Sequence, residues 1–185
     1  MLNERKVAQM ATFFLRQTSD KRLPHLKLMK LLYLADRCAV KNFGRPMSGD
    51  RFVSMRHGPA LSQTLDLMDG DTEAQPGGWE DWISDKENHE VALRHPNRSD
   101  NLDELAQAEI DVLRHVWSEF GAMMKWEIRD WTHRNCAEWS PPGYSPSSIS
   151  YEDMAHAVGF GEAEAKALAE QHQAEQDVKR IFASL

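Results

Sequence analysis

Leu26–Val40, with the sequence LKLMKLLYLADRCAV, is the stretch that decides the fold of this chain. On a helical wheel at about 100° per residue, its apolar side chains fall on one broad arc. Continued by one turn, this arc comprises Leu28, Met29, Leu31, Leu32, Tyr33, Ala35, Ala39, Val40 and Phe43. The width of the arc predicts a helix that is largely buried in the core of a mainly helical protein.

The opposite, narrower strip of this helix is basic. It carries Lys27, Lys30, Arg37 and Lys41 around a single leucine, Leu34. Like charges on one strip repel one another, so we expect this strip to face solvent or a partner. Two interpretations stay open: a binding face for an acidic partner, or a solvated face whose long side chains cover neighbouring leucines.

Asp36 falls within the apolar arc, where a carboxylate is rare unless a cation or several hydrogen-bond donors meet it. The second informative stretch, 44–62, reads GRPMSGDRFVSMRHGPALS and supplies two candidate partners, Arg56 and His57. We expect these two residues to neutralise Asp36 and to hold the local backbone. The alternative is a recognition or catalytic pair, one edge of which touches a partner.

The residues on either side of Arg56 predict two elements. Residues 51–55 alternate in the manner of a short extended segment, and His57, Gly58 and Pro59 are expected to begin a new helix that runs to Met68. Proline suits the first turn of a helix because its missing N–H would have been unpaired there, and glycine before it permits a tight entry. Arg56 and His57 would then lie beside the free backbone donors of a helix N-terminus.

The rest of the chain is also predominantly helical. Further helical periods run over 6–17, 102–120, 123–134, 151–158 and 162–182. Residues 79–83 and 90–94 predict a small hairpin with its turn at 85–88. We therefore expect a compact single-domain helical bundle over residues 1–160 with a small two-stranded β-hairpin insertion. A polar, alanine-rich C-terminal helical extension over 161–185 would protrude from it.

The bulk composition is consistent with one soluble domain. The chain has 185 residues, 41% of them apolar, and six tryptophans, which suffices for a single core. A net charge of −7 makes nucleic-acid binding an unfavoured function. Cys38 and Cys136 are the two cysteines, too few for a disulfide framework. Without a signal-peptide core or a run of about 20 apolar residues, we expect a cytoplasmic protein with no membrane partner.

Catalytic and metal chemistry have little support in the sequence. His133 and Cys136 have a spacing that could supply two zinc ligands, but a convincing site would show paired ligands twice. Remote additions would have to come from His89, His95 or His115. No serine lies in a Gly-x-Ser-x-Gly turn. We expect no catalytic residues, no metal and no cofactor, and a small metal-dependent hydrolase using His57, His133 or Cys136 is the least favoured alternative.

Three blocks in order carry a family resemblance: KLMKLLYLAD at 27–36, GRPMSGDRFVSMRHGPALS at 44–62 and KWEIRDWTHRNCAEW at 125–139. Three ordered blocks are far more specific than one motif. At these residues the chain closely resembles the Panacea domain, the SocA-like antitoxin family. The resemblance runs from about Leu23 to Trp139, and more loosely through YEDMAHAVGF at 151–160. Residues 1–160 would then be the Panacea domain.

The resemblance implies an antitoxin that neutralises a cognate toxin, encoded by the adjacent gene, by direct protein binding, with a role in phage defence. It also implies an alternative, a proteolytic adaptor that delivers the toxin to a cellular protease. Partner binding needs aromatic or arginine anchors. The candidate partner-binding residues are Lys30, Tyr33, Arg37, Arg56, His57 and Trp139. The candidate residues of the structural motif are Asp36, Gly58, Pro59, Trp131 and His133.

Overall fold

A computed structural model describes residues 1–84, 86–97 and 101–183. The described residues form eight helices: α1 (Glu4–Arg16), α2 (His25–Phe43), α3 (Ser62–Asp69), α4 (Trp79–Trp82), α5 (Gln107–Phe120), α6 (Lys125–Asn135), α7 (Tyr151–Ala157) and α8 (Glu162–Ala183). Their short strands are β1 (Arg22–Pro24), β2 (Phe52–Met55), β3 (Gly58–Leu61), β4 (Glu90–Ala92) and β5 (Ser147–Ser148). The prediction of a mainly helical protein with a small antiparallel element is confirmed.

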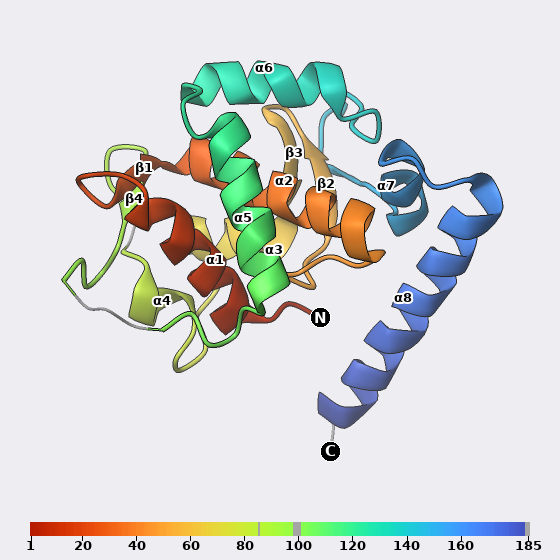
Figure 1. Cartoon of the computed structure of the whole chain (residues 1–185), viewed down its shortest axis with the longest axis horizontal. Coiled ribbons are helices and arrows are strands. Elements are labelled where there is room, and N and C mark those ends of the chain that lie inside the picture. Colours follow the sequence, from red (N-terminus) through yellow and green to blue (C-terminus); the bar gives the residue numbers. More distant parts are fainter. Residues whose placement is uncertain (85, 98–100, 184–185) are drawn as a thin grey trace.

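Helix α2 is the central element of the fold. It packs against α1, α5, α6 and α7 and against strands β1 and β3 (Figure 1). The predicted apolar arc is buried, apart from Phe43 at the C-terminal end, which is 43% exposed. Neighbours on nearly every side of α2 leave little of its surface for solvent.

The expectation that the basic strip of α2 faces outward is wrong for most of its length. Lys27, Lys30 and Leu34 are buried, whereas Lys41 is exposed. The reason is that each of the two buried lysines donates to a backbone carbonyl oxygen. Lys27 Nζ donates to Gly121 at 2.6 Å, and Lys30 Nζ donates to Pro59. A long, flexible stem lets the ammonium reach such an acceptor while its methylenes pack in the core.

Asp36 is fully buried, but the partners expected for it are wrong. Its carboxylate accepts hydrogen bonds from the backbone N–H groups of Met47 and Ser48, at 2.8 and 3.0 Å, and a short one from the Ser48 hydroxyl. Arg56 and His57 are both exposed. Three donors from one loop can hold a buried carboxylate without a cation. Asp36 therefore fastens the connection between α2 and β2 to the core.

The second sequence block forms a hairpin before it forms a helix. Strand β2 pairs antiparallel with β3, with Phe52 opposite Leu61, and Arg56-His57 is the two-residue turn between them. The prediction of an extended segment at 51–55 is confirmed, whereas the helix predicted from His57 begins only at Ser62. Pro59 is accommodated because β3 is an edge strand of the three-stranded sheet, where a missing N–H is tolerated.

Asp50 sets the position at which α3 begins. Its carboxylate accepts from the backbone N–H groups of Gln63 and Thr64, at 3.0 and 2.7 Å, and from the Thr64 hydroxyl. These are N–H groups that the first turn of a helix leaves without an intrahelical partner. The carboxylate of Asp50, which is distant in sequence, therefore caps the start of α3, whereas the sequence predicted that Pro59 would begin this helix.

The predicted strand at 90–94 is present as β4, and its ladder partner is β1, with Leu23 opposite Val91. Two isolated bridges of the expected hairpin remain, between Ile83 and Leu93 and between Glu87 and Glu90. The preceding residues form the short helix α4 in place of a strand. Residue 85, in the predicted turn, lies outside the described residues.

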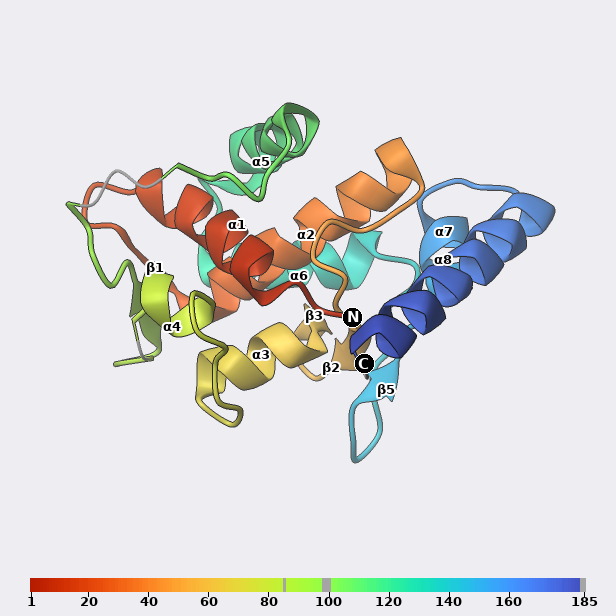
Figure 2. The ribbon, with the colours of Figure 1, turned by 90° about the horizontal axis from the view of Figure 1, so that it is seen from below.

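The C-terminal helix α8 runs along the outside of the body and contacts mainly α7 (Figures 1 and 2). Its first half is anchored by Ala165, which is buried, and by His172, whose ring stacks on Tyr151 with centroids 4.4 Å apart. Further along, Val178 and Phe182 are more than half exposed. Among the described residues, no helix is long and apolar enough to cross a membrane.

Candidate functional site

The first and second sequence blocks are joined by a buried ammonium group. Lys30 Nζ donates to the carbonyl oxygen of Pro59 at 2.5 Å, and the residue is 1% exposed. Burial lowers the pKa of Lys30 to about 7. The hydrogen bond therefore links α2 to the edge strand β3.

The second and third blocks meet at Gly58. Its φ of +91° is a left-handed conformation, and a Cβ there would lie 2.8 Å from Thr132 Oγ1 and 3.1 Å from the His133 ring. Only glycine provides both the backbone angle and the space. The hairpin formed by β2 and β3 can thus approach α6 closely.

The first and third blocks share one carboxylate, that of Glu138. Its Oε1 accepts from the Tyr33 hydroxyl at 2.6 Å and from Arg37 Nε at 2.7 Å, and its side chain is fully buried. Burial and the adjacent carboxylate raise the pKa of Tyr33. Burial acts to lower the pKa of Arg37, but the hydrogen bond and charge of Glu138 outweigh it and raise that pKa. The third block is therefore tied to α2 by a buried, hydrogen-bonded ion pair.

His133 and Trp139 stack at the C-terminal end of α6. Their ring centroids are 4.0 Å apart and their planes differ by 4°, and Trp139 Nε1 donates to the Met55 carbonyl oxygen at 3.1 Å. Burial lowers the pKa of His133, and its buried Nε2 has no hydrogen-bond partner among the described residues. Nearby, the Trp131 ring packs edge-on against Phe120. The stacked His133 and Trp139 rings fill the junction between α6 and the β2–β3 hairpin, whereas Trp131 joins α6 to α5.

The candidate partner-binding residues do not form one surface. Lys30 and Tyr33 are buried, and the Arg37 side chain is 17% exposed and paired with Glu138. Trp139 is half-buried. Side chains inside the core cannot touch a partner directly, so a docked partner would not reach Lys30 or Tyr33. Their observed contacts instead hold the three blocks together.

Arg56 and His57 lie on the outer surface, beside the start of α6. The His57 ring is 6.1 Å from the ring of Trp126, which is 47% exposed. Lys125 Nζ and Arg129 Cζ lie over the same indole, 5.3 and 4.7 Å from a ring centroid. The preceding residue, Met124, is 71% exposed. We call this group the α6 face; its members are Arg56, His57, Met124, Lys125, Trp126 and Arg129.

Sequence reasoning missed Glu138 and the apolar part of the α6 face. Tyr33 and Arg37, one turn apart on α2, were the available signal that a carboxylate would meet them. The helical period of α6 was the available signal that Trp126 would be exposed. Ile128, two positions later, points inward and is fully buried. An aromatic side chain two positions away falls on a different side of the helix.

The cysteines are poorly suited to catalysis. Cys136 is buried, and burial raises the pKa of its thiol to about 12; burial also raises the pKa of Cys38. A thiol is a nucleophile or metal ligand only as the thiolate. Within the part of the chain that the structure describes, no group of three or more His, Cys, Asp or Glu side chains could hold a metal ion.

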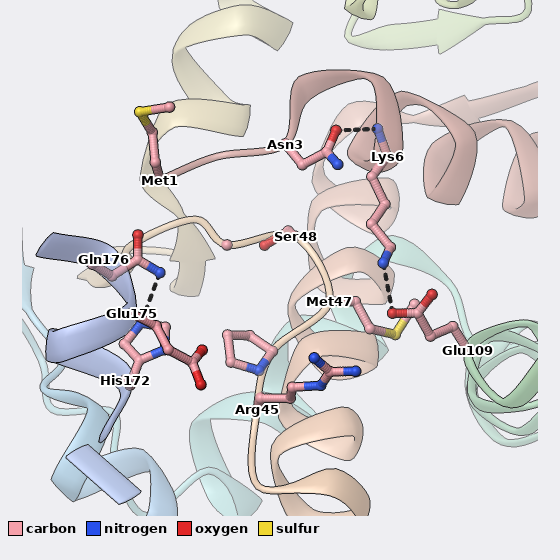
Figure 3. Close-up of a pocket in the computed structure, with 12 residues that line it drawn as sticks. Met1, Asn3, Lys6, Arg45, Met47, Ser48, Glu109, His172, Glu175 and Gln176 are labelled. Carbon is pink, nitrogen blue, oxygen red and sulfur yellow. Dashed lines mark hydrogen bonds and ion pairs between the residues drawn. The ribbon is translucent and has the colours of Figure 1, made fainter. Parts of the chain in front are cut away.

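A separate pocket of about 150 Å³ lies between the N-terminal segment, the loop after α2 and α8 (Figure 3). Several of the polar groups that line it make internal contacts. Lys6 Nζ pairs with Glu109 at 2.7 Å, the Asn3 side chain accepts from the Lys6 backbone N–H, and Gln176 and His172 share a hydrogen bond of 3.4 Å. The pocket is a polar seam between α8 and the body.

The fold and this geometry define a small, mainly helical protein in which three sequence blocks pack into one unit beneath an exposed basic and aromatic face. Residues 28–140 match the model of a family described as antitoxin SocA-like, Panacea domain. The match covers more than half of the chain, and the chain belongs to this family. No curated protein and no solved structure matches it.

Proposed function

We propose that this protein is an antitoxin that neutralises a cognate protein toxin by binding directly to it. The observation that carries the proposal is the family match over residues 28–140. That segment includes α2 from Leu28 onward, the β2–β3 hairpin and α6. The buried contacts of Lys30, Gly58 and Glu138 join these elements. The matched residues therefore form one folded unit whose outer surface could bind a partner.

The chemistry of the unit favours binding over catalysis. Its buried charged groups are engaged in structural contacts: Lys30 with a backbone carbonyl, and Glu138 with Tyr33 and Arg37. The Cys136 thiol stays protonated at neutral pH because burial raises its pKa to about 12. A neutralising protein needs a stable surface that presents anchors to its partner, and no reactive side chain.

A growth assay tests the proposal. The adjacent open reading frame is induced alone and then together with this protein, and the pair is co-purified. We expect toxicity from the neighbour alone, relief on co-expression, and a stable complex on size-exclusion chromatography.

Two control variants make the result specific. Leu31→Asp puts a charge at a fully buried core position and should abolish relief by unfolding the protein, whereas Lys166→Glu on the exposed side of α8 should leave relief intact. If the adjacent product is not toxic, or if toxicity persists when folded antitoxin accumulates, the proposed function is wrong.

Delivery of the toxin to a cellular protease is the second candidate. It is favoured by α8, whose last turns carry exposed Val178 and Phe182 beyond the contact with α7. The half-life of the toxin separates the two roles. An adaptor shortens it and depends on the protease, whereas a stoichiometric inhibitor leaves the toxin intact in a complex.

A further inference from the structure

The α6 face differs in charge from the rest of this acidic chain. The whole protein carries a net charge of −7, yet the face holds Arg56, Lys125 and Arg129. Its two nearest carboxylates are engaged locally: Glu127 accepts from the Met124 backbone N–H at the start of the helix, and Asp130 pairs with Arg129. Arg56 and Lys125 form no ion pair with any residue that the structure describes. Basic charge is therefore available to a partner here.

The face also has an apolar centre. Trp126 is 47% exposed and Met124 is 71% exposed, although both are large side chains that usually gain from burial. Lys125 and Arg129 lie over the Trp126 indole at cation–π distances. Tryptophan, methionine and arginine are the side chains enriched in the centres of protein interfaces.

The scaffold beneath the face is rigid. Ile128 and Thr132, on the inward side of α6, are fully buried. The turn that bears Arg56 and His57 is held against α6 by the close approach of Gly58 to Thr132. A surface that is ordered before binding loses less conformational entropy when a partner docks. The side chains of the face are thus presented by two elements fixed relative to each other.

From these observations we propose that the α6 face is the docking surface for an acidic segment of the toxin. Carboxylates of that segment would meet Arg56 and Lys125, and an apolar side chain among them would cover Trp126. This assignment rests on the proposed antitoxin function. Charge complementarity favours a protein partner with the opposite balance.

The experiment measures the affinity of the purified adjacent gene product for four variants by isothermal titration calorimetry. Trp126→Ala removes the apolar centre, and Arg56→Glu with Lys125→Glu reverses the exposed charge. Tyr144→Ala, at a fully exposed aromatic residue elsewhere, and Lys166→Glu on α8 are the matched controls. Circular dichroism melting confirms that each variant is folded.

We expect Trp126→Ala to weaken binding by about 30-fold or more, the range of an interface hot spot. The charge reversal should weaken binding by about 10-fold at low salt, and this difference should shrink at high salt. The two controls should bind as tightly as the wild type.

Three outcomes would overturn the assignment. If wild-type protein binds and relieves toxicity but the α6-face variants do so equally well, the surface is wrong and the antitoxin function stands. If wild-type protein neither binds nor relieves toxicity, both are wrong. If the variants lose affinity for a mixed-sequence single-stranded oligonucleotide while their affinity for the protein partner is unchanged, the face binds nucleic acid instead.

Discussion

Lys30 donates its buried ammonium hydrogen bond to the carbonyl oxygen of Pro59, 2.5 Å away, and so ties the central helix to the edge of a sheet. The residue is 1% exposed, and among the described residues no carboxylate forms an ion pair with it. An ammonium in such a place is costly because its charge has lost most of its hydration. Burial accordingly lowers the pKa of Lys30 from 10.5 to about 7.

The depressed pKa of Lys30 predicts how the free energy of unfolding depends on pH. Between about pH 7 and the unfolded pKa, the unfolded chain binds more protons at this residue than the folded one, so stability rises with pH. We expect the wild type to gain about 2 kcal/mol, relative to Lys30→Met, between about pH 7 and pH 8.5. Urea unfolding of both proteins across this range measures the difference.

Lys166→Met, at an exposed position on α8, is the matched control and should keep the wild-type pH dependence. Cys136 is present in both proteins, so the raised pKa of its thiol, which acts in the opposite direction, cancels from their difference. Parallel curves for wild type and Lys30→Met would contradict a buried ammonium at this position.

Asp36 provides a second stability test. Asp36→Ala leaves two backbone N–H groups and the Ser48 hydroxyl without their buried acceptor, and should cost about 3 kcal/mol or more. Asp36→Asn can accept from both N–H groups with its oxygen and donate to the hydroxyl oxygen, so its cost should be under about 1 kcal/mol. Chemical denaturation near neutral pH measures both.

The pKa of Asp36 adds a signature that the asparagine variant lacks. Burial raises this pKa from 3.8 to about 6, although the hydrogen bonds from Ser48 and Met47 favour the charged form. The folded chain then binds more protons than the unfolded one between these values, so stability falls as pH rises from about 4 to about 6. The wild type should lose about 2 kcal/mol relative to Asp36→Asn over this range, and equal slopes would refute the shift.

The periodic part of the fold could be predicted from the sequence, and the contacts between elements could not. The apolar arc of α2 follows directly from residue spacing, and its burial is confirmed. The burial of Lys27 and Lys30 depends on carbonyl groups of Gly121 and Pro59, and a backbone acceptor has no residue-type signal. The same holds for Asp36, whose partners are N–H groups in a loop.

The site shows the same division. The family resemblance of the three blocks is confirmed by the match over residues 28–140. The charge of Lys30 and the hydroxyl of Tyr33 indicated a binding surface, but both residues are buried. Side-chain length was the deciding property: Tyr33 and Arg37 reach across to Glu138, so their polar ends are satisfied without solvent. The helix predicted at Pro59 failed because a distant carboxylate, Asp50, determines where α3 begins.

Gly58 is predicted to be intolerant of any side chain. In Gly58→Ala the new methyl group would combine a left-handed backbone with a contact of 2.8 Å to Thr132 Oγ1, so we expect a loss of about 3 kcal/mol. Gly70→Ala is the matched control, because Gly70 has a φ of +77° with nothing near its Cβ, and should cost only about 1 kcal/mol. Thermal melting of both variants distinguishes crowding from backbone strain, and equal losses would rule out the crowding.

Glu138 is predicted to hold the third block to α2. In Glu138→Ala the buried guanidinium of Arg37 loses its ion pair and the Tyr33 hydroxyl loses its acceptor, which should cost about 3–5 kcal/mol. Glu152→Ala, at an exposed carboxylate on α7, should change stability by less than about 0.5 kcal/mol. A second change separates the charges from their packing: Arg37→Met combined with Glu138→Leu and Tyr33→Phe removes both charges and the Tyr33 hydroxyl together. It should recover much of the loss, because apolar side chains of similar volume need no partner. If this triple variant is as unstable as Glu138→Ala, the shape of the replaced side chains, rather than the unpaired polar groups, accounts for the loss.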